Sequence, residues 1–307
     1  MKKDAAQKKG RFDANVCSNQ QIGTRFWRLR LEMNGPGAKS FATALPGQFA
    51  QLDVSNLPLP DKENIPEDLR DSVSRNILLR RPFSFTDIAP GENKTDVEIL
   101  YCARGPGTLR MTSLREGGRV SIIGPLGNGF SVPEGGKTAL LVAGGMGIAP
   151  LVHLQRFLSQ NHPNIRIVSF IGAKTAQELP YGPQNELAGS EYRVEAIQAT
   201  DDGSAGFKGP ITLCLEEWLQ KNGPFSSQCV IYSCGPEVML ARIAEIAKIQ
   251  DMPCQVSLER MMACGIGLCQ SCAVECIVPG SKETVYKLCC EDGPVFDSRE
   301  VAWNANK

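Results

Sequence analysis

The sequence predicts a multi-domain β + α/β protein: an antiparallel β-barrel, a parallel α/β domain and a small C-terminal module rich in cysteine. Short β-favouring runs broken by glycine, proline and asparagine extend from about residue 22 to 132. Strand and helix patterns then alternate from 138 to 249, and cysteines crowd the remainder. Because 307 residues exceed one typical domain, we expect three, at 11–134, 135–252 and 253–307.

The expected barrel has four clear strand patterns. They are residues 26–31, 48–52, 97–101 and 119–123. Short strands separated by turn residues are typical of antiparallel barrels and sandwiches. Residues 56–74 interrupt this pattern with proline, aspartate and glutamate and show no strong periodicity. We expect them to form a surface insertion, either a loop or a short charged helix.

The expected α/β domain opens with a buried-strand pattern at 138–143. Helical patterns at 148–158, 213–221 and 237–249 alternate with further strand patterns at 165–171, 192–199 and 228–233. This alternation predicts a parallel sheet covered by helices.

The overall charge and hydropathy exclude several classes of protein. The 33 basic residues balance 33 acidic ones, so we expect neither a nucleic-acid nor a membrane-surface partner. No stretch approaches the roughly 20 apolar residues that span a bilayer. The basic N-terminus is followed by no apolar segment, so we expect no secretory signal and a cytoplasmic protein.

The cysteines are the most specific feature of the chain. Of 12 cysteines, six fall in the last part, and Cys264, Cys269 and Cys272 are spaced as C-x4-C-x2-C. In the absence of an export signal we expect free thiols, and this spacing is typical of plant-type [2Fe-2S] sites. Gly265 and Gly267 allow the loop to turn closely around a cluster. Such a centre would stabilise a module too short for an ordinary core.

The spacing leaves the fourth ligand open, because Cys289 and Cys290 are adjacent. Cys276 is more simply a small buried hydrophobic residue. A zinc site with four thiolates is the alternative, although zinc modules usually pair two C-x2-C knuckles. A non-enzymatic, zinc-stapled binding module is therefore the alternative of another class, and a colourless protein would favour it.

Two glycine turns suggest a dinucleotide site. Gly144, Gly145 and Gly147 follow a predicted strand and lead into a helix, so they would offer backbone N–H groups and a helix dipole to a pyrophosphate. Cys234 and Gly235 follow another predicted strand at the same carboxyl edge of the sheet. Either turn alone is explained by tight packing, but together they favour a binding site.

Two segments of the barrel region suit a flavin nucleotide. They are Arg81, Pro82, Phe83 and Ser84, and then Gly107 and Thr108. A fixed cation suits a phosphate, an aromatic face suits a flavin ring and a hydroxyl suits a ring nitrogen. In isolation, a strand start and a plain turn would explain both segments.

The preference between NAD and NADP stays open from the residues alone. Lys174 follows one predicted strand, where a cation could meet a 2′-phosphate, whereas Asp201 and Asp202 follow the next one.

Taken in order, these motifs resemble the ferredoxin-NADP reductase superfamily. They are residues 81–84, 107–108, 124–130, 144–147 and 234–236. Residues 259–269 and 290–296 resemble more specifically the electron-transfer subunits of dihydroorotate dehydrogenase B.

This resemblance implies three cofactors: FAD, a [2Fe-2S] cluster and NAD. It implies that Arg81 holds the FAD pyrophosphate and that Phe83 and Ser84 face the isoalloxazine. Leu100, Tyr101, Cys102, Gly107 and Thr108 would complete the FAD site, although the family usually has arginine where this chain has Cys102. It also implies that Cys290 is the fourth cluster ligand.

The resemblance further implies a partner that bears FMN on a β/α barrel, with two copies of each chain. The partner would oxidise dihydroorotate to orotate in pyrimidine biosynthesis, and electrons would pass through the cluster and FAD to NAD+. A hydride carrier moves two electrons and a cluster moves one, so a flavin must stand between them, and no catalytic acid or base is expected.

Two other enzymatic roles compete with this one. The small subunit of a ferredoxin:NADP oxidoreductase or sulfide dehydrogenase resembles the chain in its cofactors. An oxygenase reductase would need a domain-sized ferredoxin module, for which the C-terminal segment is too short.

Overall fold

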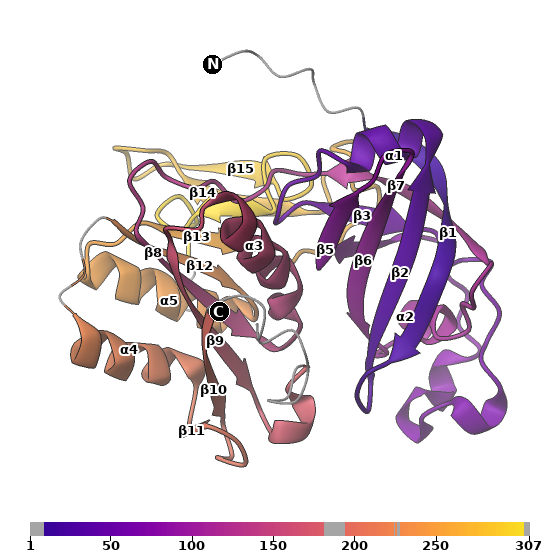
Figure 1. The fold of residues 1–307 in the computed structure, drawn as a ribbon, viewed down its shortest axis with the longest axis horizontal. Coiled ribbons are helices and arrows are strands. Elements are labelled where there is room, and N and C mark those ends of the chain that lie inside the picture. Colours follow the sequence, from indigo (N-terminus) through magenta and orange to yellow (C-terminus); the bar gives the residue numbers. More distant parts are fainter. Residues whose placement is uncertain (1–8, 181–193, 224, 226–227, 304–307) are drawn as a thin grey trace.

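The computed structural model describes residues 9–180, 194–223, 225 and 228–303. Two seven-stranded sheets stand side by side, with one helix, α3 (Ile148–Asn161), between them and a C-terminal hairpin above them (Figure 1). This arrangement confirms the predicted fold class. The basic segment 1–8 and the first two residues of the strand expected at 192–199 lie outside the described residues.

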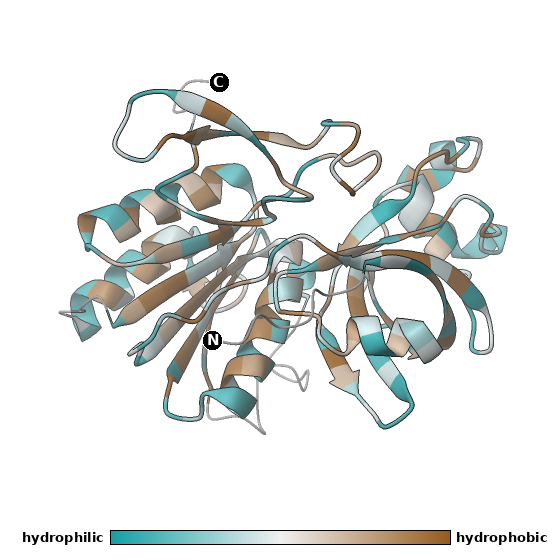
Figure 2. Cartoon of the chain, turned by 90° about the horizontal axis from the view of Figure 1, so that it is seen from above, coloured by the Kyte–Doolittle hydropathy of each residue, from teal (hydrophilic) through white to brown (hydrophobic). Residues whose placement is uncertain are grey.

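The first sheet is antiparallel and curls around an apolar interior (Figure 2). Its order is β4-β3-β7-β1-β2-β6-β5. The strands are β1 (Gly10–Gln21), β2 (Phe26–Asn34), β3 (Phe49–Leu52), β4 (Arg81–Ser84), β5 (Asp87–Pro90), β6 (Lys94–Cys102) and β7 (Arg119–Leu126). Inward residues such as Leu29, Leu31 and Ile99 are fully buried. The four strands predicted here are β2, β3, β6 and β7.

β1 is a central strand that the sequence did not predict. It lies between β2 and β7, yet Ala14 and Val16 are its only buried residues. Two neighbouring strands satisfy its backbone, so this strand forms without the apolar alternation by which strands are recognised.

The 56–74 segment forms two short 3-10 helices, η1 (Lys62–Asn64) and η2 (Glu67–Ser72). Ile65 and Leu69 pack against Leu109 of α2 (Pro106–Met111), and Asp68 pairs with Arg25 at 2.6 Å. The insertion is therefore a small satellite core attached to α2. The other helix of this half, α1 (Gly35–Phe41), packs over one end of the barrel (Figure 1).

The second sheet is parallel except at one edge, with the order β11-β10-β9-β8-β12-β13-β16. Its strands are β8 (Thr138–Gly144), β9 (Arg166–Ala173), β10 (Val194–Thr200), β11 (Phe207–Lys208), β12 (Cys229–Cys234), β13 (Cys254–Ser257) and the antiparallel β16 (Val295–Asp297). α3 covers one face, while α4 (Ile211–Asn222) and α5 (Glu237–Ile249) cover the other (Figure 1). Short 3-10 turns η3 (Gly145–Gly147) and η4 (Ala176–Glu178) follow β8 and β9. All three predicted helices are confirmed.

The C-terminal part is joined to this sheet through β13 and β16. Its remaining strands, β14 (Ala273–Ile277) and β15 (Thr284–Leu288), form a separate hairpin. Cys272, Cys276 and Cys289 share one buried cluster with Phe49 of the barrel and with the α/β core. The cysteine-rich segment therefore packs against both larger parts. Among the described helices, none is long and apolar enough to cross a membrane.

Candidate functional site

A cavity of about 320 Å³ lies where the three parts of the chain meet. The barrel half contributes Pro82, Phe83, Ser84, Leu100, Tyr101, Cys102 and Thr108, the α/β half contributes Met146 of η3, Ala149 and Pro150 of α3 and Cys234 of β12, and the cysteine-rich segment contributes Ser257, Leu258, Glu259, Arg260 and Met262. Its walls are mostly apolar or aromatic. Such a cavity suits a flat ring system held by a few polar groups.

The predicted flavin residues line this cavity with two exceptions, Arg81 and Gly107, which directly precede the lining residues Pro82 and Thr108 in the sequence. The Arg81 guanidinium donates to the carbonyls of Leu79 and Arg80, at 2.8 and 3.2 Å. A β-carbon on Gly107 would lie 3.3 Å from Arg81 Cγ, so the glycine allows the arginine to pack closely.

Thr108 fixes the turn before α2. Its Oγ1 accepts the N–H groups of Arg104 and Gly105, at 3.0 and 3.1 Å. The Tyr101 hydroxyl donates a hydrogen bond to Asn19 Oδ1 (3.1 Å), and the Tyr101 ring packs edge to face against that of Phe83. The cavity wall is therefore fixed before any ligand binds.

A second cavity, of about 790 Å³, opens at the carboxyl edge of β8, β9 and β12. It is lined by the predicted Gly144, Gly145, Gly147 and Gly235. A β-carbon on Gly147 would collide with the carbonyl of Cys234, and one on Gly235 would lie 3.0 Å from the Gly144 backbone. The two glycine turns thus touch each other, which leaves their N–H groups and the start of α3 beside the cavity.

The charged lining of the second cavity is mixed. Of the three residues that left the dinucleotide preference open, Lys174 and Asp201 both line it, whereas Asp202 is not among the lining residues. Glu178 and Arg242, which the sequence did not single out, line it as well. Arg242 is already paired with Glu216 and Glu245.

Arg104, Met146 and Glu259 line both cavities, so the two are adjacent. Burial raises the pKa of the Glu259 carboxyl, and the charge of Arg104 opposes that rise. The sequence did not single out Arg104, and Glu259 stood out only as the first residue of the 259–269 motif, because no spacing pattern indicates that either residue lines a cavity.

The cysteine loop supplies backbone donors to sulfur. The N–H groups of Ile266 and Cys269 each lie 3.4 Å from Cys264 Sγ, and the Gly267 N–H lies 3.2 Å from Cys290 Sγ. Donors that point at sulfur stabilise thiolates, the form that binds metal.

The two candidates for the fourth ligand differ in orientation. Cys290 Sγ faces the loop through Gly267, whereas Cys289 Sγ lies 3.3 Å from the carbonyl oxygen of Leu258. Cys276, in β14, is fully buried, which agrees with its interpretation as a small hydrophobic residue.

The thiols fit a metal centre in their electrostatics as well. The Ser271 hydroxyl lowers the pKa of Cys269 to about 6. Burial raises the pKa of Cys290 to about 12, so a thiolate there needs nearby positive charge, which iron would supply.

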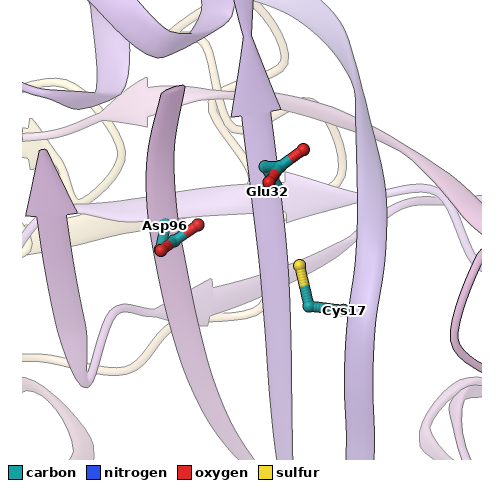
Figure 3. Close-up of side chains that lie close together, drawn as sticks. All are labelled: Cys17, Glu32 and Asp96. Carbon is teal, nitrogen blue, oxygen red and sulfur yellow. The ribbon is translucent and has the colours of Figure 1, made fainter. Parts of the chain in front are cut away.

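A further group of possible ligands lies on the barrel surface, where Cys17, Glu32 and Asp96 come together from β1, β2 and β6 (Figure 3). Lys94 already places a cation there: its Nζ lies 2.9 Å from Glu32 and 3.5 Å from Asp96. We assign no metal to this group.

Two family profiles match the chain. Residues 259–302 match the profile described as the iron-sulfur cluster binding domain of dihydroorotate dehydrogenase B. Residues 141–245 match an oxidoreductase NAD-binding domain.

The chain is also similar over almost its whole length to proteins that share one name. It is 36% identical to the dihydroorotate dehydrogenase B (NAD+) electron transfer subunit of Geobacillus thermodenitrificans, over 95% of this chain and 98% of the relative. It is 33% identical to the corresponding subunit of Caldanaerobacter subterraneus, again over 95% and 98%. A probable subunit of this kind from Methanopyrus kandleri is 36% identical, over 94% of this chain and 90% of the relative.

Solved structures share the fold. A chain of an NADH-dependent reduced ferredoxin-NADP oxidoreductase superposes with a TM-score of 0.71 at 25% identity, over 94% of this chain and 90% of that one. The ferredoxin reductase of carbazole 1,9a-dioxygenase superposes with a TM-score of 0.62 at 19% identity, over 81% and 68%.

Proposed function

Because the chain belongs to the family of dihydroorotate dehydrogenase B (NAD+) electron transfer subunits, we propose that it takes electrons from a catalytic partner and delivers them to NAD+. It is an oxidoreductase subunit of pyrimidine biosynthesis, and its cofactors are a [2Fe-2S] cluster, FAD and NAD. When bound, the cluster carries single electrons, FAD exchanges one or two, and NAD+ accepts a hydride.

One observation carries this proposal: a single cavity is lined by all three parts of the chain. Phe83 comes from the barrel, Cys234 from the nucleotide-binding sheet, and Met262 from the segment that leads into the cysteine loop. A flavin in this cavity would be next to the dinucleotide on one side and next to the cluster on the other. The three domains proposed above, 11–134, 135–252 and 253–307, would each supply one cofactor site.

We assign the flavin to the cavity lined by Pro82, Phe83, Ser84, Leu100, Tyr101, Cys102 and Thr108, and we include Arg81 and Gly107 because they directly precede Pro82 and Thr108 in the sequence. Arg81 is free to turn from two backbone carbonyls to a pyrophosphate, because a phosphate is a stronger partner for a guanidinium than a neutral carbonyl is. Cys102 would make van der Waals contacts with the flavin, in place of the positive charge that the family's arginine usually supplies at this position.

We assign the dinucleotide to the larger cavity. The turn at Gly144, Gly145 and Gly147 would receive its pyrophosphate at the start of α3. Cys234 and Gly235 would stand where the nicotinamide approaches the flavin, since Cys234 lines the flavin cavity and Gly235 lines the dinucleotide cavity.

We assign the cluster to Cys264, Cys269, Cys272 and Cys290. The adjacent cysteines offer a matched test, because both are buried and only Cys290 faces the loop. We expect Cys290→Ala to purify without the iron-sulfur absorption and Cys289→Ala to retain it. Loss of the cluster from Cys289→Ala alone would reverse the assignment.

The family name implies a catalytic partner subunit, which we propose to be an FMN-bearing β/α barrel present in two copies with two copies of this chain. The surface around the cysteine loop suits such a contact, because Met261 and Leu268 are 90% and 78% exposed and Ile266 is half exposed. Apolar side chains gathered around a redox centre are typical of a protein interface.

Co-expression with the companion chain tests this function. We expect a companion that binds FMN, and NAD+ reduction that depends on dihydroorotate only when both chains are present. A companion carrying FAD and further iron-sulfur clusters would instead support a ferredoxin:NADP oxidoreductase. That alternative is not favoured, because the likeness to such an enzyme is 25% identical, against 33% and 36% for the subunits named above.

A zinc-stapled binding module is not favoured either, because the cysteine segment matches an iron-sulfur domain. The purified protein should therefore show flavin bands together with longer-wavelength iron-sulfur absorption.

A further inference from the structure

Gln51 lies on β3 between the flavin cavity and the cysteine loop. Phe49, two residues earlier on the same face of the strand, lines the flavin cavity. Gln51 is fully buried one step further along and is not among the residues that line that cavity. The strand thus runs from the flavin cavity towards the cysteine loop.

The side-chain amide of Gln51 is left without partners. Neither Nε2 nor Oε1 has a hydrogen-bond partner within the described part of the chain. Leaving a buried amide without hydrogen bonds destabilises the folded state, and nearly all buried polar groups in folded proteins have a partner. The amide therefore points to a group that the working protein holds at this position.

The residue that the amide faces is Gly265, directly after Cys264. A β-carbon on Gly265 would lie 2.5 Å from Gln51 Nε2 and 2.8 Å from its Cγ. The donor end of the amide therefore rests against the cysteine loop. Two backbone N–H groups already converge on Cys264 Sγ in this loop, so Gln51 brings a side-chain donor to a place where donors gather around sulfur.

We propose that Gln51 Nε2 donates a hydrogen bond to a sulfur of the bound iron-sulfur cluster and is a positioning residue that couples the flavin barrel to it. This rests on the cluster site proposed above. Thiolate and sulfide only accept hydrogen bonds, which matches the donor end of the amide. A donor at sulfur stabilises the extra negative charge of the reduced cluster, so Gln51 raises the cluster's reduction potential.

The test uses the purified holoprotein. Gln51→Leu and Gln51→Met keep the bulk of the side chain and remove the donor. Thr86→Val is the matched control. The Thr86 hydroxyl is also fully buried and has no hydrogen-bond partner within the described residues. Thr86 lies in the barrel, however, where its backbone N–H donates to the carbonyl of Glu98. The measurements are the midpoint potentials of cluster and flavin and the electron paramagnetic resonance spectrum of the reduced cluster.

We expect both Gln51 variants to lower the cluster potential and change its resonance spectrum, and Thr86→Val to change neither. The expected shift is about tenfold in the ratio of reduced to oxidised cluster at a fixed potential, or about 59 mV for one electron. An unchanged potential in both Gln51 variants would overturn the proposal, because a buried water would then satisfy the amide. So would a shift of the flavin potential alone.

Loss of the cluster from both variants, with FAD retained, would also overturn the proposal. That result would show that Gln51 is needed to hold the cysteine loop in place, rather than to tune a cluster that is already bound. The wild-type protein separates this inference from the proposed function. If wild-type protein lacked a cluster signal, the cluster site itself would fail. If it carried the cluster and the variants matched it, only the role of Gln51 would fail.

Discussion

At the scale of single residues, Gly265 meets two constraints at once. Its φ of +71° is in the left-handed region, and a β-carbon there would reach the buried Gln51 amide. Gly265→Ala should therefore cost about 1–2 kcal/mol in backbone strain and also push the cysteine loop away from the barrel. We expect the variant to purify with little iron and sulfide, measured by chemical analysis against flavin content.

Gly280 provides the control for the backbone contribution. Its φ is +77°, and a β-carbon there would meet nothing within 4 Å. Gly280→Ala should lower the melting temperature slightly and leave the cluster content unchanged. Equal cluster loss in both variants would show that φ alone, rather than the contact with Gln51, limits position 265.

Single residues also show what the sequence could reveal about the site. The spacing of Cys264, Cys269 and Cys272 identified a candidate cluster loop, because one loop must supply several ligands at fixed intervals. Spacing could not separate Cys289 from Cys290, since only the fold decides which of two neighbouring side chains faces the loop. Gln51 was missed because the sequence does not show that its side chain is buried, nor that the amide lacks a hydrogen-bond partner.

At the scale of elements, the 56–74 insertion packs against α2, the helix that carries part of the proposed flavin site. Leu69 of η2 is 4% exposed and packs on Leu109 of α2, and the first turn of α2 contains Gly107 and Thr108. Leu69→Ala should destabilise the protein by about 2 kcal/mol and weaken FAD retention during gel filtration. Leu78→Ala, at a residue 89% exposed, should change neither, and equal FAD loss in both would contradict the supporting role.

An ion pair joins β5 of the barrel to α3 of the second sheet. Arg156 lies 2.8 Å from Asp87 and 3.8 Å from the buried Glu98. Burial raises the pKa of the Asp87 carboxyl, and Arg156 opposes that rise. Arg156→Met should lower the free energy of unfolding by about 1–3 kcal/mol at neutral pH, because two carboxylates lose a cation.

The pH dependence of that loss has a definite sign. A carboxyl whose pKa is raised in the folded state stabilises the protein at low pH and loses that contribution as pH rises through the raised pKa. Because Arg156→Met raises the Asp87 pKa further, its deficit should be largest near pH 8 and shrink towards about pH 4. Denaturant-induced unfolding of the wild-type protein and the variant at several pH values measures this difference in the free energy of unfolding. Arg70→Met, at an exposed pair with Glu67, should stay within about 0.5 kcal/mol at every pH, and a pH-independent Arg156 deficit would contradict the electrostatic origin.

Helices and strands were predictable where one face is buried and the apolar residues therefore recur with a clear period. α5 was predicted at its observed bounds, Glu237–Ile249, because its apolar residues recur at helical spacing. β1 was missed because both of its neighbours satisfy its backbone while most of its side chains are polar. The way in which β13 and β16 extend the parallel sheet was not predictable, because pairing between strands distant in sequence leaves no local pattern.

At the scale of the whole molecule, the flavin cavity has a different neighbour on each side. The dinucleotide cavity adjoins it through Arg104, Met146 and Glu259. The cysteine loop adjoins it through β3 and Met262, and the cluster residues take no part in lining the dinucleotide cavity. The two halves of electron transfer should therefore be separable by substitution.

Cys290→Ala should abolish electron transfer from the partner to the flavin and leave electron transfer between the flavin and the dinucleotide intact. We expect this variant to keep NADH-dependent reduction of ferricyanide, which needs only the flavin and the dinucleotide cavity, and to lose dihydroorotate-dependent NAD+ reduction in the complex to background. Gly147→Val should abolish both, because a side chain there collides with the Cys234 carbonyl and separates the two turns. If Cys290→Ala lost both activities together with its FAD, the cluster would be needed to hold Glu259 and Met262 against the flavin cavity, and the two halves would form a single structural unit.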